Sequence, residues 1–519
     1  MLFNQRYGKW WHLLVLIILV AVPIIKVNPF TKPLFWDGGV FVYIAQQIST
    51  GYAPYLTAFD HKTPLFGLVG ALFISAGRLI SLSDILAIRF GAFLLTVVHV
   101  CLLFWLVKKL TKSTLAAYVS AIFLAGFSGY ADINASWIDP KSVLLLTQTA
   151  LICCMFKGRY FLAGVCSILC GLAWQPGFML CALAPFAFLI ASSHTTTKVK
   201  PLLFFAAGSA VCVAFFLTYI ILSGALKDFF DQAFLFNFAY YIPEKLPSTI
   251  LAQLQHIESI IFRFYGPEVW EFHLALTLLP VFAVITFKFR AESPAEDKTK
   301  TTYALVLFTA TGYLLIAQVN FASGPHLLPF LDLIPLINIL TAWTLWQYGI
   351  KKLKSIKPFI CNKQLITLRQ VTMTGIVVLS VGISFRHLPN KCETITLQQQ
   401  QDWINKVLTS GQYKTVQVVG ASEFLVLANL RNLTKYLYFY NGVADFQKFQ
   451  INQVQNMFAS EKVPDIIVVA RNGGNPFQAL IESSYTQIDS ITMAPDDIQS
   501  YDLKCIGSWG VTTLVYKRN

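Results

Sequence analysis

Charged residues are scarce in this chain of 519 residues: only 13% are Asp, Glu, Lys or Arg, while 55% are hydrophobic. A soluble globular protein has about 25% charged residues. Acidic residues are the scarcer sign, with 26 Asp and Glu against 40 Lys and Arg. This composition excludes an ordinary soluble protein and indicates a polytopic membrane protein with room for one further domain.

The sequence also lacks a CxxC pair, an internal repeat and a low-complexity tract. Without CxxC pairs no cysteine metal site is predicted, and without repeats a repeat-built transporter is disfavoured. Most of the ten cysteines lie in apolar segments and are expected to be small core residues. Cys392 and Cys505 stand apart near the two ends of the polar C-terminal part. They predict either a disulfide formed in an oxidising compartment or two free thiols.

Apolar runs of about 17–25 residues can cross a bilayer as helices. The run 64–80 is apolar too, but counting it as a span would put every Lys-rich loop outside. The positive-inside rule therefore favours an interfacial or re-entrant helix there, a cytoplasmic N-terminus, a retained first span and about eleven spans. The expected spans are 11–30, 85–107, 115–130, 142–156, 160–174, 178–191, 201–222, 272–287, 303–318, 327–346 and 365–385.

The net charge of +14 comes from residues 1–386, where Lys and Arg cluster in short loops between apolar runs. Membrane topology explains this pattern, so no nucleic-acid partner is predicted. From residue 387 onward, short β-type runs at 414–420 and 464–470 alternate with helix-like pieces. We therefore expect an all-α membrane domain over 1–386 and a small soluble α/β domain over 387–519, on the extracytoplasmic side.

An acid follows the first predicted span. Asp37 precedes Gly38 and Gly39, which would let a ligand approach the backbone closely. A carboxylate at the membrane edge could act as a general base on an acceptor hydroxyl. The alternative is a loop carboxylate that caps the following helix.

The same outer loop, 31–84, contains a second ionisable group, the turn Asp60-His61-Lys62. Ionisable residues held beside a bilayer are costly and tend to serve a function. Lys62 could bind a phosphate as a point charge. The alternative is a lysine whose side chain extends to lipid headgroups.

Asp139 and Pro140 begin another predicted span at the outer face. Asp suits the position before a helix and Pro suits its first turn, so a purely structural cap is one interpretation. The other is a second acid that faces the same cavity as Asp37. Asn134 and Trp137 lie nearby in the sequence and could hydrogen-bond to a sugar or stack on it.

Two further candidates lie in outer loops. His326 could contact a phosphate, or it could be a structural histidine. Tyr240 could stack on a sugar, or it could anchor the chain at the membrane interface.

In their order and common sidedness, these positions resemble the GT-C superfamily of polyprenyl-phosphate-sugar-dependent glycosyltransferases. The nearest likeness is the branch with protein O-mannosyltransferases and lipid A aminoarabinose transferases. The family has a catalytic acid after the first span, Tyr and Ala on a short helix, Gly, and then an acid–Lys–Pro–Pro–Leu turn. The matching residues are Asp37, Tyr43, Ala45, Gly51, Asp60, Lys62, Pro64 and Leu65, and 138–140 resembles a second outer acid motif.

The sequence departs from the family pattern at three places. The family turn often reads Lys-Pro-Pro, whereas Thr63 stands between Lys62 and Pro64 here. The family's Thr-Lys-Gly-Phe turn looks like residues 175–178, which lack the lysine, and its Tyr-x-Leu-Pro element corresponds to 326–329. Gly38 stands where an acid often follows the catalytic acid, which leaves the acceptor class and the need for a divalent metal open. No other cofactor is implied.

The resemblance implies an inverting transfer of a sugar from a polyprenyl phosphate to a hydroxyl acceptor on a glycan, lipid or protein. It implies a GT-C fold whose loop 31–84 forms juxtamembrane helices, on the outer face of a membrane, here expected to be the bacterial inner membrane. Asp37 would deprotonate the acceptor, and Asp139 would orient it or assist. Lys62, with His326, would hold the lipid phosphate, and Asp60, His61, Tyr43, Asn134, Trp137 and Tyr240 would complete the substrate site.

Two other classes of function remain. A transporter or lipid flippase could use the same charges as a substrate pathway, and Asp332 lies well inside a predicted span. An inactive GT-C-like scaffold could bind a partner through its C-terminal domain.

Overall fold

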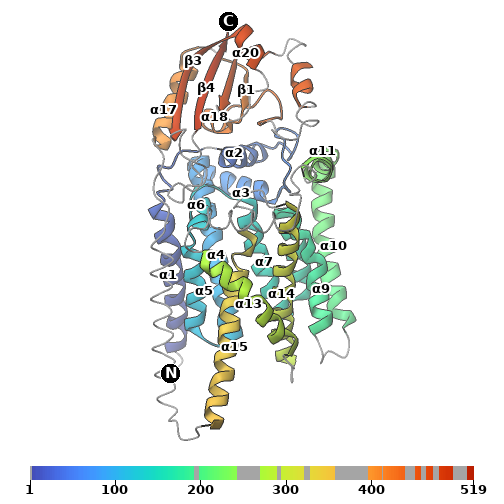
Figure 1. Ribbon diagram of the computed structural model, residues 1–519. Helices are drawn as coiled ribbons and strands as arrows, with labels where there is room; N and C mark the ends of the chain where they lie inside the picture. Colours follow the sequence, from blue (N-terminus) through green and yellow to red (C-terminus); the bar gives the residue numbers. More distant parts are fainter. Residues whose placement is uncertain are drawn as a thin grey trace.

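The chain folds into a bundle of long helices with a small β-sheet at one end (Figure 1). The structure is a computed structural model that describes residues 3–34, 36–191, 198–241, 269–288, 294–320, 328–356, 395–411, 413–438, 450–456, 463–470, 478–494 and 511–519. The expected span 365–385, His326, the cysteines at 392 and 505, and the domain boundary at 386/387 all lie outside these ranges. They stay predictions.

The first half of the chain supplies most of the bundle. Its helices are α1 (Phe3–Lys26), α2 (Trp36–Ser49), α3 (Leu65–Leu79), α4 (Asp84–Thr111), α5 (Thr114–Gly126), α6 (Ser128–Ser136), α7 (Pro140–Lys157), α8 (Tyr160–Ala173), the 3₁₀ turn η1 (Gln175–Met179), α9 (Leu180–Ala191), α10 (Val199–Leu222), α11 (Leu226–Phe230) and the π-helical turns η2 (Asp231–Leu235) and η3 (Asn237–Tyr241).

The second half completes the bundle and builds the sheet. Its elements are α13 (Val269–Lys288), α14 (Pro294–Asn320), α15 (Leu333–Ile356), α17 (Leu397–Thr409), β1 (Val416–Val419), α18 (Ser422–Ala428), β2 (Ile466–Ala470), α20 (Gln478–Ser484), β3 (Tyr485–Ala494) and β4 (Val511–Arg518).

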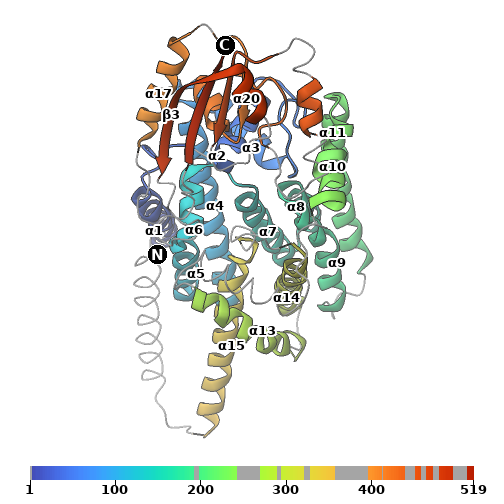
Figure 2. The same cartoon turned by 45° about the horizontal axis from the view of Figure 1, so that its top comes forward.

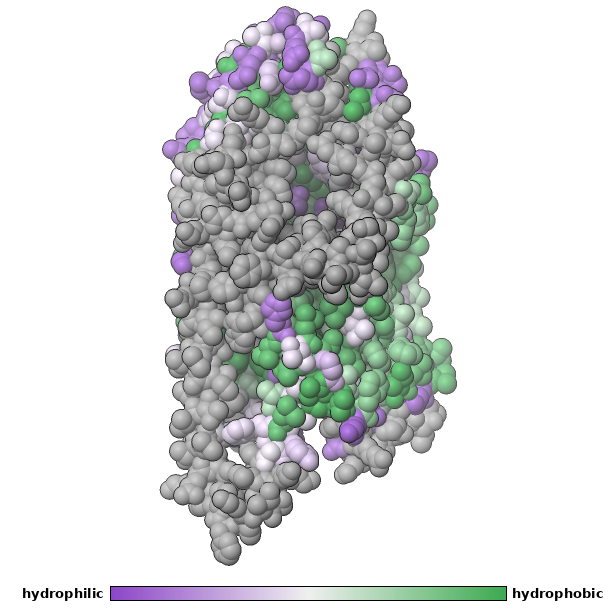
Figure 3. Space-filling view, viewed as in Figure 1, coloured by the Kyte–Doolittle hydropathy of each residue, from purple (hydrophilic) through white to green (hydrophobic). Residues whose placement is uncertain are grey.

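Several helices of the bundle have the length and hydrophobicity of membrane spans. Among the described residues, three helices are long and apolar enough to span one: Asp84–Thr111, Val199–Leu222 and Leu328–Gly349. The bent pair α5–α6 would make a fourth if it counts as one span. Hydrophobic residues gather on the surface of the lower bundle, and hydrophilic ones gather around the sheet (Figure 3). The protein is therefore an integral membrane protein, and the full number of spans stays a prediction.

Helices α2 and α3 lie across the upper ends of the long helices, between the bundle and the sheet (Figures 1 and 2). The charge pattern predicted that the apolar run containing α3 does not cross the membrane. In the structure this run indeed does not pass through the bundle. The Lys-rich end of α4 and the N-terminus lie at the opposite end of the bundle from the sheet. Which of the two ends faces the cytoplasm stays a prediction.

The sheet has the strand order β1-β2-β4-β3. Strands β1 and β2 run parallel, while β4 is antiparallel to both of its neighbours. The sequence predicted β1 and β2 but not the other two strands. The sheet shares a core with the bundle, because Phe41 of α2 belongs to the same buried cluster as Val418 and Phe424. The C-terminal part is therefore packed on the membrane part through α2.

Helices α8 and α10 pack with direct backbone contact. A Cβ atom on Gly164 would collide with the carbonyl oxygen of Phe205, and one on Gly208 would collide with that of Phe161. Small residues let membrane helices approach each other this closely, and the packing itself stabilises the pair.

We expect Gly208→Ala to lower the stability of the protein by about 1–3 kcal/mol or more, because the new methyl group meets backbone that cannot rotate away. Gly349→Ala on α15 is the matched control, since nothing lies within 4 Å of its Cβ position. It should leave stability unchanged or raise it by up to about 1 kcal/mol. Thermal unfolding of both variants in detergent checks this, and equal melting temperatures would contradict the close contact.

Candidate functional site

Asp37 lies exposed in the first turn of α2, the helix that crosses the end of the bundle. The two glycines after it do not face open space. A Cβ on Gly38 would collide with the indole ring of Trp137, and one on Gly39 would lie 2.7 Å from the backbone nitrogen of Glu423. The glycines thus let α2 pack between the α6–α7 connection and α18. The expectation that they admit a ligand is corrected.

The turn Asp60-His61-Lys62 lies close to Asp37. The Asp60 carboxylate is buried and accepts a 3.1 Å hydrogen bond from the Lys62 backbone N–H, with the Lys62 Nζ at 4.0 Å. Burial raises the pKa of Asp60 to about 6; Lys62 opposes this shift and the Asp37 carboxylate adds to it. The Lys62 Nζ also lies 4.9 Å from the centre of the Phe41 ring on α2.

Three amide side chains hold this turn in place. Gln175 of η1 donates to the His61 carbonyl at 2.5 Å, and Asn237 of η3 donates to the same oxygen at 2.6 Å. The Asp60 backbone N–H donates to Gln232 of η2 at 3.1 Å. The His61 ring lies 5.9 Å from that of Phe236. The turn is therefore fixed by segments more than a hundred residues away.

Asp139 caps α7, accepting a 2.7 Å hydrogen bond from the backbone N–H of Lys141. The structural interpretation of Asp139 is thus confirmed, and a second role beside Asp37 stays a prediction. Asn134 is buried and donates to the carbonyl of Tyr130 within α6. Trp137 is buried against Gly38, with no hydrogen-bond partner for its Nε1 among the described residues.

The C-terminal part contacts the outer loop at several points. Tyr43 is fully buried, and its hydroxyl accepts a 3.1 Å hydrogen bond from the backbone N–H of Asn432. The backbone N–H of Phe59 donates to the carbonyl of Lys435 at 2.6 Å, and Gln400 bonds both backbone groups of Leu34. The tyrosine chosen as a substrate ligand therefore lies where α2 meets the C-terminal part. The backbone of Tyr240 lies in η3, and its side chain is outside the described set.

Several buried charges escaped the sequence analysis. Lys141 is buried and lies directly after the Asp-Pro pair. A lysine at the outer end of a span departs from the positive-inside pattern, and this departure could have singled it out in the sequence. Lys32, in the loop before α2, and Asp132 of α6 form a buried 2.5 Å ion pair. Arg89 donates to the carbonyls of Pro29, Lys32 and Ser136, which ties the loop before α2 to the α6–α7 connection.

Asp332 precedes α15 and is fully buried, with both carboxylate oxygens occupied. Gln148 and Thr149 of α7 each donate to it at 2.7 Å. Tyr313 in turn donates to Gln148 at 2.8 Å, and His99 contacts Thr149 at 3.1 Å. This connected polar cluster joins the inner helices of the bundle.

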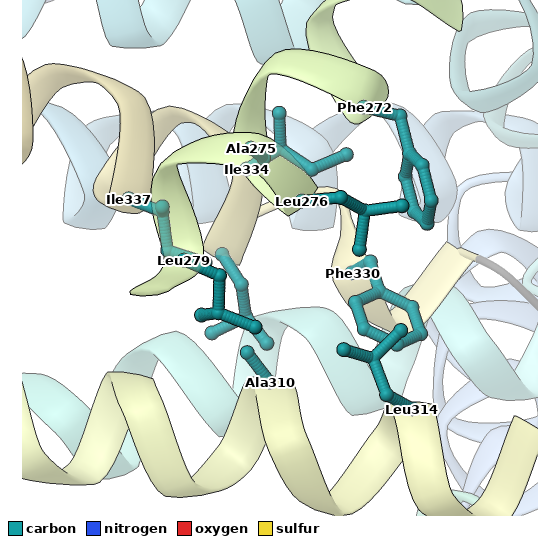
Figure 4. A pocket seen from close by; sticks show the side chains of 10 residues that line it. Phe272, Ala275, Leu276, Leu279, Ala310, Leu314, Phe330, Ile334 and Ile337 are labelled. Atoms are coloured by element: carbon teal, nitrogen blue, oxygen red, sulfur yellow. The ribbon is translucent and has the colours of Figure 1, made fainter. Parts of the chain in front are cut away.

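An apolar pocket lies between α13, α14 and α15 (Figure 4). Every residue that lines it is hydrophobic, among them Phe272, Leu276, Leu314 and Phe330. Such a lining suits only an apolar group.

Within the described ranges, no group of three or more His, Cys, Asp or Glu side chains could hold a metal ion. Asp37, Asp60, Asp139, Lys62 and Lys141 form a mixed cluster of acids and lysines. The arrangement suits proton transfer and anion binding.

Two solved structures have a fold similar to that of this chain. ArnT from Cupriavidus metallidurans bound to undecaprenyl phosphate superposes with a TM-score of 0.61 over 98% of both chains, at 9% sequence identity. The chain has the GT-C fold. The Archaeoglobus fulgidus oligosaccharyltransferase shares it with a TM-score of 0.52 over 88% of this chain and 67% of that one, at 13% identity. No protein-family model and no curated protein matches the sequence.

In this version of the GT-C fold, a buried acid lies where the C-terminal part meets α2. Glu423 is fully buried at the start of α18, with Thr513 donating to one carboxylate oxygen at 3.4 Å. Its other oxygen has no hydrogen-bond partner among the described residues. Burial raises the pKa of Glu423 to about 8.

We therefore expect the free energy of unfolding to fall as the pH rises from about 5 to about 8. In this interval the folded state keeps the Glu423 proton while the unfolded chain has released it. Glu423→Gln should remove the part of this decline that lies above about pH 6, where the raised pKa of Asp60 no longer contributes, and should gain stability over wild type as the pH rises. Thermal unfolding across this pH range checks it, with Glu482→Gln as the control because the Glu482 side chain on α20 is exposed. Parallel pH profiles of wild type and Glu423→Gln would refute the assignment.

Proposed function

We propose that this protein is an inverting glycosyltransferase that moves a sugar from a polyprenyl phosphate to a hydroxyl acceptor on the extracytoplasmic face. One observation carries the proposal: the exposed carboxylate of Asp37 lies close to a turn that contains the partly buried Lys62. Asp37 is on α2, which crosses the end of a bundle with the GT-C fold (Figure 1). The similar ArnT structure contains undecaprenyl phosphate, which supports a lipid phosphate as donor.

Asp37 would act as the general base. It takes the proton of the acceptor hydroxyl while that oxygen forms a bond to the anomeric carbon, and the bond from this carbon to the phosphate oxygen breaks. The polyprenyl phosphate leaves with one more negative charge than it had in the donor. The Asp37 side chain is exposed, so an acceptor that arrives from the aqueous side can reach it.

Lys62 would stabilise the charge on the departing phosphate. Asp60 and Phe41 fix the direction of its side chain, and the amide clamps on His61 fix its backbone. A preorganised cation of this kind stabilises the transition state more than the donor, because the charge on the phosphate grows during the reaction. Asp139 would orient the acceptor while it caps α7.

The test is release of sugar from a panel of radiolabelled polyprenyl-phosphate sugars by the purified full chain. We expect turnover of one donor by wild type and a loss of about 10²–10⁴-fold in Asp37→Asn, the range that a general base contributes. Asp402→Asn on α17 is the matched control and should keep full activity, because this exposed acid lies on the solvent side of the C-terminal part.

Full activity of Asp37→Asn would remove the base from this position. Absence of turnover with every donor, when a hydroxyl acceptor extract is supplied, would count against the transferase and favour the scaffold or transporter interpretation.

A further inference from the structure

Among the residues that the structure describes, a buried lysine at the outer end of α7 has no salt-bridge partner. Lys141 is 4% exposed, and among the described residues its ammonium group makes no hydrogen bond and no ion pair. Its backbone N–H donates to Asp139, which leaves the Nζ atom as the only part of the residue with unused donors. Burying an ammonium group without a paired anion is costly, so such a group tends to have a function.

The surroundings of Lys141 connect it to the turn that contains Lys62. Its Nζ lies 5.9 Å from the centre of the Trp174 ring. The next residue, Gln175, donates to the carbonyl of His61, the neighbour of Lys62. The charged groups that act on Lys141 are Asp139, Lys62 and Asp37. The two lysines therefore share one electrostatic environment, and each repels the other's charge.

We propose that Lys141 is a second phosphate-binding cation of this site and binds, together with Lys62, the phosphate of the lipid-linked donor. The inference rests on the proposed function and adds a residue to it. A phosphate between two ammonium groups relieves their mutual repulsion and satisfies the unused donors of Lys141. Two cations also favour the departing polyprenyl phosphate over the donor, since the departing group has the greater negative charge.

A purely structural lysine that rests on Trp174 through a cation–π contact is the competing explanation. Lys141→Met separates the two, because methionine retains an unbranched apolar side chain but has no charge. Lys141→Arg keeps the charge. Lys227→Met is the control, because the Lys227 side chain is 88% exposed and pairs with Asp231 within its own helical segment.

The experiment measures binding of undecaprenyl phosphate, undecaprenol and inorganic phosphate to the full chain in detergent, together with the melting temperature of the ligand-free protein. Lys141→Met should bind undecaprenyl phosphate about 10- to 100-fold more weakly, the effect of losing one charge-assisted hydrogen bond, with undecaprenol binding unchanged. Its melting temperature should stay equal or rise, because an unpaired buried charge has been removed. Lys141→Arg and Lys227→Met should keep the preference of wild type.

The binding measurements with undecaprenyl phosphate and with inorganic phosphate distinguish the two possible sources of the phosphate group. Binding of undecaprenyl phosphate that depends on Lys141, with much weaker binding of inorganic phosphate, supports the lipid as the ligand. Tight binding of inorganic phosphate that depends on Lys141 to the same degree would overturn the lipid assignment.

Other outcomes overturn the role of Lys141. An unchanged preference for undecaprenyl phosphate over undecaprenol in Lys141→Met, with a lower melting temperature, would make the residue structural and leave the proposed donor intact. A wild-type protein that does not discriminate between the two lipids would overturn both the role of Lys141 and the proposed donor.

Discussion

The burial of most of α2 and of the turn around Asp60 is the constraint on which the rest of the structure depends. Loop 31–84 lies between the bundle and the sheet, and both sides are in contact with its backbone. In this setting each buried polar group needs a partner. The clamps on His61 and Asp60, the bonds of Gln400 to Leu34 and the bond from Asn432 to Tyr43 supply such partners from distant segments. The loop therefore acquires one conformation through tertiary contacts instead of its own propensities.

The same dehydration strengthens the interactions among the charges at this end of the bundle. Lys32 and Asp132 neutralise each other at 2.5 Å, and Arg89 is satisfied by three backbone carbonyls. Lys141 is different, because among the described residues its ammonium group makes no hydrogen bond to the acids that act on it, Asp139 and Asp37. Charges that are fully paired hold the fold, whereas a buried cation without such a partner, as proposed for Lys141, is free to bind an anion.

Membrane character could be predicted from composition, because hydrophobic length is a local property of the chain. Strands β1 and β2 could be predicted too, since each is a short run of buried residues that are mostly β-branched. Strand β3 could not, because it is an edge strand whose side chains are mostly exposed and whose register is interrupted by bulges. Its pairing with β4 is a property of the sheet and leaves little trace in either segment.

Some residues of the candidate site could likewise be predicted from the sequence, and others could not. Asp37, Asp60 and Lys62 could be found because a charge beside an apolar run is conspicuous, whereas the clamps Gln175, Gln232 and Asn237 are ordinary amides until the fold brings them to one turn. Tyr43 was chosen for its position in a motif, but packing places its hydroxyl against Asn432. For a residue that is buried by the fold, position in the chain does not reveal which neighbour it meets.

The buried cluster around Asp332 bears on the choice between transferase and transporter. A transport pathway needs ionisable groups that can exchange partners as the helices move. Both oxygens of Asp332 are instead held by adjacent residues of one helix, and Gln148 is fixed in turn by Tyr313. A satisfied network of this kind makes α7, α14 and α15 rigid relative to one another. A rigid bundle that supports a fixed constellation of charges at its end is what a transferase requires, since catalysis depends on groups that are already in place before the reaction.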